Sequence, residues 1–284
     1  MTTITQSKME TFPKIEARSR RFWRPLLPAF SQRTLTWYAI AIFLFLYLPI
    51  FILVIYSFNA NKVVGVWQGF SLRWYQELFQ DAAIGSALRV SLWVGFWSTL
   101  ISVILGTLAA IVLERYEFAG KLPYDAVLYL PIIIPDIVMA LSALLFFVLV
   151  AVPLSRYTVL ITHVAFNISF VAVVVRARLH GMDRRLEEAA ADLGADEWTT
   201  FRRITLPLLM PAVVSAALLA FTLSLDDFVI TFFVAGPGST TLPVRVYSMI
   251  KFGVTPEVNA ISTLMLVGST LLVVISLLLQ RREA

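Results

Sequence analysis

Six long apolar stretches constrain this chain more than any other feature of its sequence. A helix that crosses a bilayer core needs about 20 mainly apolar residues, because its backbone polar groups must bond within the segment. Only 14% of the residues are charged, whereas a soluble domain carries about 25%. The sequence therefore predicts an all-α, polytopic membrane protein whose bundle has six transmembrane helices. These run through residues 36–58, 84–113, 126–152, 157–176, 208–235 and 260–280.

The distribution of basic residues predicts the topology. Membrane proteins carry an excess of Lys and Arg on their cytoplasmic side. All but six of the 23 Lys and Arg residues lie in the first 35 residues, in 114–125, in 176–206 or in the C-terminal tail. The exceptions are Lys62, Arg73, Arg89, Arg156, Arg245 and Lys251. We therefore expect an inner-membrane protein with both termini in the cytoplasm, a cytoplasmic leader at 1–35 and a membrane domain at 36–284.

Composition excludes several kinds of site. The chain has no cysteine and only two histidines, His163 and His180, so neither a Cys-based nor a His-rich metal centre is expected. No Gly-x-x-x-x-Gly-Lys-Ser/Thr loop occurs, so nothing in the sequence cradles nucleotide phosphates. The net charge of +5 comes from residues between apolar runs, which indicates topology signals rather than a nucleic-acid partner. We expect no metal, no cofactor and no nucleic acid.

The polar segment 183–207 is predicted to fold as helix, turn and helix. Asp183 is a candidate N-cap, Gly194 ends the first helix, Asp196 caps the second, and Pro207 marks the entry to the next span. Small and apolar side chains share one face of the first helix: Leu186, Ala189, Ala190 and Leu193. Such a face suits insertion into a groove on a partner protein. The alternative is an ordinary solvated linker with helical propensity.

The same segment carries a family signature. It contains Glu-Ala-Ala, three residues, Gly, nine residues, Ile, one residue and Leu-Pro, at Glu188, Ala189, Ala190, Gly194, Ile204, Leu206 and Pro207. This pattern resembles the signature loop of binding-protein-dependent ABC importer permeases. The resemblance implies a type I ABC importer permease fold, with 183–207 as the coupling loop seated in a cleft of an ATPase subunit. It also implies two ATPase copies, a second homologous permease and a periplasmic binding protein, with ATP hydrolysed outside this chain, which is not itself an enzyme.

Three carboxylates fall within the predicted spans: Asp136, Asp226 and Asp227. Each costs at least about 2.5–3.5 kcal/mol to insert. Pro131 and Pro135 are expected to kink the third span beside Asp136, near the membrane midplane. Neighbouring helical residues diverge by about 100°, so only one residue of the Asp226–Asp227 pair is expected to face a pathway. These carboxylates either meet a cationic substrate or serve a structural role, as a helix cap or as the partner of a basic residue in another subunit.

Two further features carry weaker expectations. His163 and Asn167, one turn apart on the fourth span, are predicted to be interhelical hydrogen-bond partners. Residues 72–79 are predicted to form a short amphipathic helix in the membrane interface. Its aromatic residues fit either an interfacial belt or the docking of an external partner.

A second resemblance concerns the substrate. The segments 223–230, 236–238, 241–243, 71–79 and 256–260 are similar to those of putrescine/spermidine importer permeases, and the similarity runs from about residue 40 to residue 280. It implies uptake of a polyamine delivered by a periplasmic polyamine-binding protein. Three alternatives stay open: a permease for another solute, a secondary transporter driven by an ion gradient, and a membrane scaffold without transport. The sequence does not identify the preferred polyamine.

Overall fold

A computed structural model describes residues 32–281 apart from residues 64, 252 and 254. Most of the predicted leader therefore lies outside the described residues. The chain divides into two compact units after Ile50. The described part of the first unit is helical and belongs to α1 (Gln32–Tyr56), which corresponds to the predicted span 36–58.

Within the described residues, regular structure is helical apart from one isolated bridge between Asn59 and Phe70, which confirms the predicted all-α class. The second unit contains, after the end of α1, α2 (Arg73–Gln80), α3 (Ala82–Arg115), α4 (Lys121–Ile133), α5 (Asp136–Leu149), α6 (Arg156–His180), α7 (Arg185–Asp192) and α8 (Glu197–Thr200). A π-helical turn (Phe201–Thr205) then leads into α9 (Leu206–Asp226), which is followed by α10 (Val229–Val234), α11 (Leu242–Lys251) and α12 (Pro256–Arg281).

Within the part of the chain that the structure describes, five helical segments are long and apolar enough to cross a membrane. They are Arg33–Tyr56, Ala82–Arg115, Arg156–His180, Glu197–Asp226 and Pro256–Val274. The pair formed by α4 and α5 passes the same test together but bends by 112° at its break. The predicted count of six is reached when this bent pair is counted as one span.

Two predicted spans are not continuous helices. The third, 126–152, was expected to kink but instead breaks at Ile134, whose backbone is extended, because a residue that precedes a proline is disfavoured in the helical region. The fifth, 208–235, ends as a helix at Asp226. Asp227 is extended, with φ −65° and ψ 122°, and α10 begins separately two residues later. Both breaks lie beside the intramembrane carboxylates.

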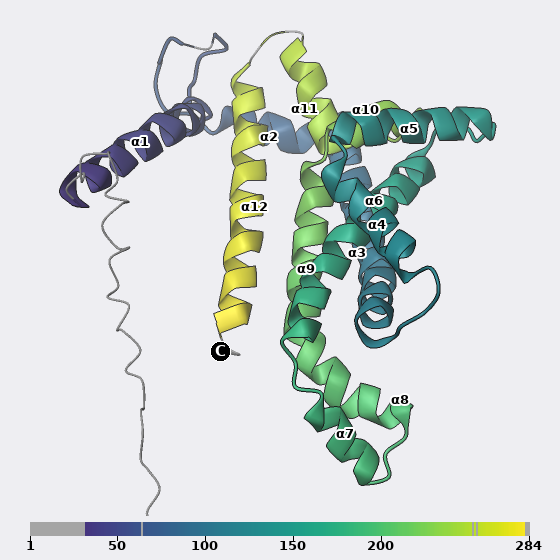
Figure 1. Ribbon diagram of the computed structural model, residues 1–284. Helices are drawn as coiled ribbons and strands as arrows, with labels where there is room; N and C mark the ends of the chain where they lie inside the picture. Colours follow the sequence, from purple (N-terminus) through teal and green to yellow (C-terminus); the bar gives the residue numbers. More distant parts are fainter. Residues whose placement is uncertain (1–31, 64, 252, 254, 282–284) are drawn as a thin grey trace, which may run out of the picture. The chain divides into compact units, whose positions relative to one another are not determined.

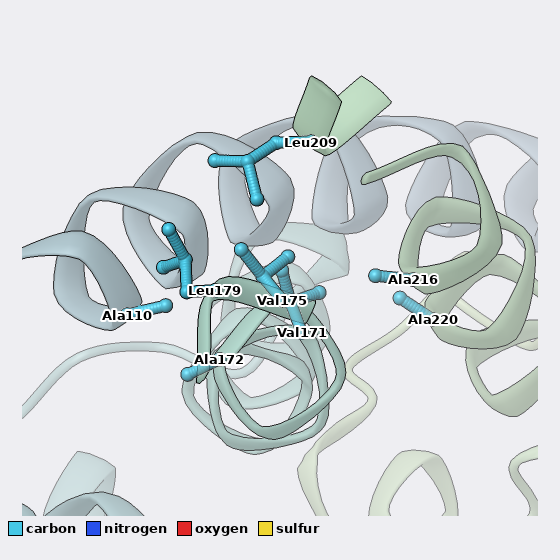
Figure 2. Packing of buried hydrophobic residues seen from close by; sticks show 8 residues of the cluster. All are labelled: Ala110, Val171, Ala172, Val175, Leu179, Leu209, Ala216 and Ala220. Carbon is cyan, nitrogen blue, oxygen red and sulfur yellow. The ribbon is translucent and has the colours of Figure 1, made fainter. Parts of the chain in front are cut away.

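The main core lies where α3, α6 and α9 pack against one another (Figure 1). Figure 2 shows its buried side chains, which are small or β-branched apart from two leucines: Ala110, Val171, Ala172, Val175, Leu179, Leu209, Ala216 and Ala220. A glycine lets α3 and α6 approach closely, because a Cβ at Gly106 would lie 2.8 Å from the side chain of Val171. A second cluster joins α5 and α10 to α3 and α6.

Candidate functional site

The 183–207 segment folds as predicted, into a helix, a turn and a short helix. Figure 1 places α7 and α8 at the end of α9 that lies away from α10 and α11. Arg184 rather than the predicted Asp183 is the N-cap residue of α7, and the carboxylate Oδ1 of Asp183, one residue earlier, accepts a hydrogen bond from the backbone N–H of Arg185 at 3.0 Å. Asp196 takes the predicted N-cap position of α8. A hydrogen bond from Thr199 lowers the pKa of the Asp196 carboxyl.

The turn after α7 requires its glycine. Gly194 has φ +83°, a left-handed conformation that other L-residues adopt at a cost. Its N–H donates to the carbonyl of Ala191 at 2.9 Å, and the N–H of Ala195 donates to the carbonyl of Ala190 at 3.0 Å. These two bonds form the Schellman end of a helix and confirm the predicted stop.

Three of the four residues on the predicted small-residue face of α7 are exposed, namely Leu186, Ala189 and Leu193, and the expectation is corrected only for Ala190. Ala190 is only 8% exposed and packs within its own chain, whereas Ala189 is exposed. Leu193 of this face is 89% exposed, and Trp198 of the following helix, which the prediction did not include, is 65% exposed. The largest exposed apolar side chains of the segment therefore lie at its tip, around the turn between α7 and α8.

The other signature residues lie along the same segment. Glu188 is exposed, Ile204 is half-buried in the π-helical turn, and Leu206 and Pro207 begin α9. Proline is well tolerated in a first helical turn, where its missing N–H would have no partner in the helix. The signature therefore spans α7, the turn and the start of the fifth span.

Charged residues anchor this segment to the bundle, which the sequence reasoning missed. Glu187 Oε1 accepts from Arg115 Nη2 at 2.9 Å and from Thr205 Oγ1 at 2.7 Å. Arg184 Nη2 donates to the carbonyl of Glu114 at 3.1 Å. Glu187 lies 72 residues from Arg115 in the chain, so no local pattern signals the contact.

Asp227 has a structural role in this arrangement. Its carboxylate accepts hydrogen bonds from the N–H of Ile230 at 3.1 Å, and from the N–H and hydroxyl of Thr231 at 2.8 Å each. It also lies 3.2 Å from Nε2 of His163. The carboxylate thus caps α10 and ties it to α6, which is the structural alternative considered for this pair.

His163 and Asn167 have different outcomes. His163 is buried and makes interhelical bonds as predicted, with Nδ1 2.7 Å from the hydroxyl of Ser224 on α9. Asn167 is fully buried, but neither atom of its amide has a partner among the described residues. The prediction of a hydrogen-bond partner is wrong for Asn167.

Asp226 faces a cavity instead. It is the last residue of α9, and its carboxylate lines a cavity of about 530 Å³ between α2, α3, α9 and α12. Asp226 is exposed, and among the described residues its carboxylate accepts one long hydrogen bond of 3.4 Å, from the hydroxyl of Ser269. The remaining walls are mainly apolar and include Leu88, Leu92, Phe221 and Leu264. A carboxylate with spare acceptor capacity in an apolar cavity favours a cation.

Asp136 occupies a third setting. It begins α5 directly after the break, its side chain is exposed, and no described residue bonds to its carboxylate. It does not line the cavity that holds Asp226. The structure therefore separates the three predicted pathway residues rather than gathering them.

Aromatic residues follow the two aspartates of the fifth span. Phe228 packs against Tyr247, with ring centroids 4.7 Å apart, and against Phe232 at 5.3 Å. Phe228 and Tyr247 line a second cavity of about 340 Å³. Met265 belongs to the walls of both cavities, so the two cavities are neighbours.

The predicted helix at 72–79 is present as α2. Trp74 is buried, and its Nε1 donates to the carbonyl of Asn59 at 2.7 Å. Phe79 is largely exposed and forms part of the cavity wall. Trp74 therefore fixes the helix to its own chain, and the choice between an aromatic belt and a docking surface concerns the exposed residues alone.

The described residues thus form a bundle of helices long and apolar enough to cross a membrane, with α7 and α8 projecting from one end of α9 (Figure 1). Residues 102–282 match the family described as binding-protein-dependent transport system inner membrane component. The chain belongs to this family. It is a permease subunit of the inner membrane rather than an enzyme, as the sequence predicted.

Curated relatives of this chain are also transport system permease proteins. The chain is 45% identical to the spermidine/putrescine transport system permease protein PotC of Haemophilus influenzae, over 85% of this chain and 94% of that protein. It is 49% identical to the putrescine transport system permease protein PotI of Escherichia coli K12, over 79% of this chain and 82% of that protein.

Solved structures confirm the expected type I ABC importer permease fold. A chain of a bacterial ABC transporter that imports the acidic polysaccharide alginate superposes with a TM-score of 0.69, 18% identity, and coverage of 88% of this chain and 96% of that chain. A chain of the MetNI methionine ABC transporter superposes with a TM-score of 0.59, 19% identity, and coverage of 76% and 100%. At these identities the likeness concerns the fold alone.

Proposed function

We propose that this chain is the transmembrane permease subunit of an ATP-driven polyamine importer and forms half of the pathway for putrescine or spermidine. The observation that carries the proposal is the exposed Asp226 carboxylate, which has spare acceptor capacity at a mainly apolar cavity. The 44–49% identity to putrescine and spermidine permeases supports the substrate class.

The chemistry of a polyamine matches these walls. Its ammonium groups are separated by methylene chains, so one charge can pair with Asp226 while the methylenes lie against leucines. The rings of Phe228 and Tyr247 line the second cavity, which shares Met265 with the first, and they offer cation–π contact to a second ammonium. The proposal includes Asp136, because its exposed carboxylate at the helix break has no partner among the described residues. Asp227 holds α10 in place beside the pathway.

The 183–207 segment is proposed to dock on an ATPase subunit. Leu193 and Trp198 present the apolar surface that such docking would bury. The complete system then contains two ATPase subunits, a second homologous permease and a periplasmic polyamine-binding protein. ATP binding and hydrolysis move the docked segments and switch the pathway between two rigid-body arrangements.

The orientation follows from the same assembly. Docking on an ATPase requires the 183–207 segment to face the cytoplasm, and the distribution of Lys and Arg supports this placement. Both termini then lie in the cytoplasm. We propose the same division as the sequence predicts, with a leader at 1–35 and a membrane domain at 36–284.

Uptake of radiolabelled putrescine and spermidine tests the proposal, in cells that express the whole system with and without this subunit. Uptake should require the subunit and should persist while ATP is available, even when an uncoupler collapses the ion gradient. Asp226→Asn should raise the KM for both polyamines, and Asp226→Glu, which keeps the charge, should restore most uptake. Wild-type kinetics in Asp226→Asn would remove this residue from the pathway.

A further inference from the structure

We infer that Glu187 is a positioning residue, forming the joint that transmits motion of the docked 183–207 segment to α3 and to the start of α9. This inference rests on the proposed function, because it needs an ATPase that moves the segment. Glu187 is adjacent to Glu188 of the family signature. Glu187 is bonded to its own chain, whereas Glu188 is exposed.

A single carboxylate oxygen joins three elements. Glu187 Oε1 on α7 accepts from Arg115 Nη2 at the end of α3 and from Thr205 Oγ1 in the π-helical turn before α9. The Arg115 side chain is 12% exposed, that of Glu187 is 23% exposed, and Thr205 is buried. Water and salt screen a partly buried ion pair of this kind less than an exposed one, so the joint is well placed to resist bending.

The end of α3 is itself held firmly. Glu114, the neighbour of Arg115, binds Arg176 of α6 at 3.1 Å through its carboxylate, and its carbonyl accepts from Arg184 just before α7. Arg176 also binds Asp125 of α4 at 2.6 Å. The segment is therefore attached at two consecutive residues to a helix end that is tied to α4 and α6. A displacement of α7 that keeps these bonds must carry α3 with it.

The bond between Glu187 and Thr205 stabilises the π-helical turn that joins α8 to α9. Residues Phe201–Thr205 join α8 to α9, and π-helical turns are rare interruptions of a regular helix, frequent at functional sites. Such an interruption offers a place where the segment could bend against α9. The Thr205 hydroxyl, bonded to Glu187, closes the turn against α7. Without this bond, motion of the docked helix would be absorbed in the turn instead of reaching the span.

The two adjacent glutamates, Glu187 and Glu188, have different roles in this inference. Glu188 is exposed, and its carboxylate has no partner among the described residues, so it is free to meet the ATPase. Glu187 points inward and is bonded to its own chain. Loss of Glu188 should weaken docking on the ATPase. Loss of Glu187 should leave docking intact but lower the amount of substrate taken up per ATP hydrolysed.

The test uses the whole transporter, reconstituted in vesicles with its ATPase, its partner permease and the binding protein. Uptake of radiolabelled putrescine and ATP hydrolysis are measured together, and the ATPase that co-purifies with each variant is quantified. Glu187→Ala and Thr205→Val should retain the ATPase and its hydrolysis but lower uptake per ATP by about ten-fold, the equivalent of roughly 1.4 kcal/mol of lost charge-assisted bonding. Thr205→Ser keeps the hydroxyl and should behave like the wild type.

Wild-type uptake per ATP in both Glu187→Ala and Thr205→Val would overturn the inference. Loss of the ATPase from Glu187→Ala would also overturn it, because Glu187 would then belong to docking. If the ATPase fails to co-purify with the wild-type chain, the proposed function itself is contradicted, which keeps the two failures distinct.

Discussion

Replacing Gly194 with alanine perturbs the 183–207 segment through its backbone alone. The residue has φ +83°, and a Cβ built there meets nothing within 4 Å, so crowding adds no penalty. An L-residue in this left-handed conformation costs about 1–2 kcal/mol. That cost corresponds to roughly a 5- to 30-fold decrease in the population of molecules in which α7 ends as observed. We expect Gly194→Ala to lower both ATPase co-purification and polyamine uptake within this range, while membrane insertion stays normal.

Gly181 supplies a matched control at the same end of the bundle. It has φ −86°, and a Cβ there makes ordinary contacts, the nearest at 3.7 Å from the carbonyl oxygen of Arg178. Gly181→Ala should therefore leave uptake and co-purification unchanged. Gly194→Asn should be milder than Gly194→Ala, because asparagine tolerates the left-handed region better. Equal behaviour of Gly194→Ala and Gly181→Ala in both assays would refute the reasoning.

Three further predictions compare neighbouring residues. Ala190→Arg should reduce the yield of folded protein because Ala190 is buried, whereas Ala191→Arg, at an exposed site, should spare folding and weaken ATPase co-purification; equal yields would contradict the packing. Asp227→Asn should lower stability by about 1–3 kcal/mol, seen as a fall in the thermal unfolding midpoint with little change in KM, the opposite of the pattern expected for Asp226→Asn. His163→Ala should lower the same midpoint by breaking the tie between α6 and α10, and an unchanged midpoint would show that the tie contributes little.

Much of the fold could be predicted because hydropathy reports on spans directly. The structure departs from those predictions where apolar sequence continues across a break in the helix. Ile134 is as apolar as its helical neighbours, and apolar residues resume directly after Asp226 and Asp227, so mean hydropathy over a span does not mark the ends of α4 and α9. The proline at 135 indicated a bend, but its 112° angle depends on packing far from it in the chain.

The candidate sites divide in the same way. Gly194 and Asp196 act within a few residues, so the turn between α7 and α8 could be predicted from the sequence. The division between Asp226 and Asp227 depends on contacts with Ser269 and His163, which are distant in the chain. The bond between Glu187 and Arg115 also joins residues that are distant in the chain. The turn at Gly194 and the cap at Asp196 depend on nearby residues. Which of the two carboxylates has its hydrogen bonds filled depends on tertiary contacts.

The central claim is that the tip of the 183–207 segment seats in an ATPase subunit. The chain contains no cysteine, so a single Leu193→Cys variant gives one defined attachment point, with Ala190→Cys as a buried control on the same helix. Crosslinking from Leu193→Cys in the assembled, transport-competent system should capture the ATPase, while Ala190→Cys should not. Full uptake without any crosslink to the ATPase from Leu193→Cys would contradict the account.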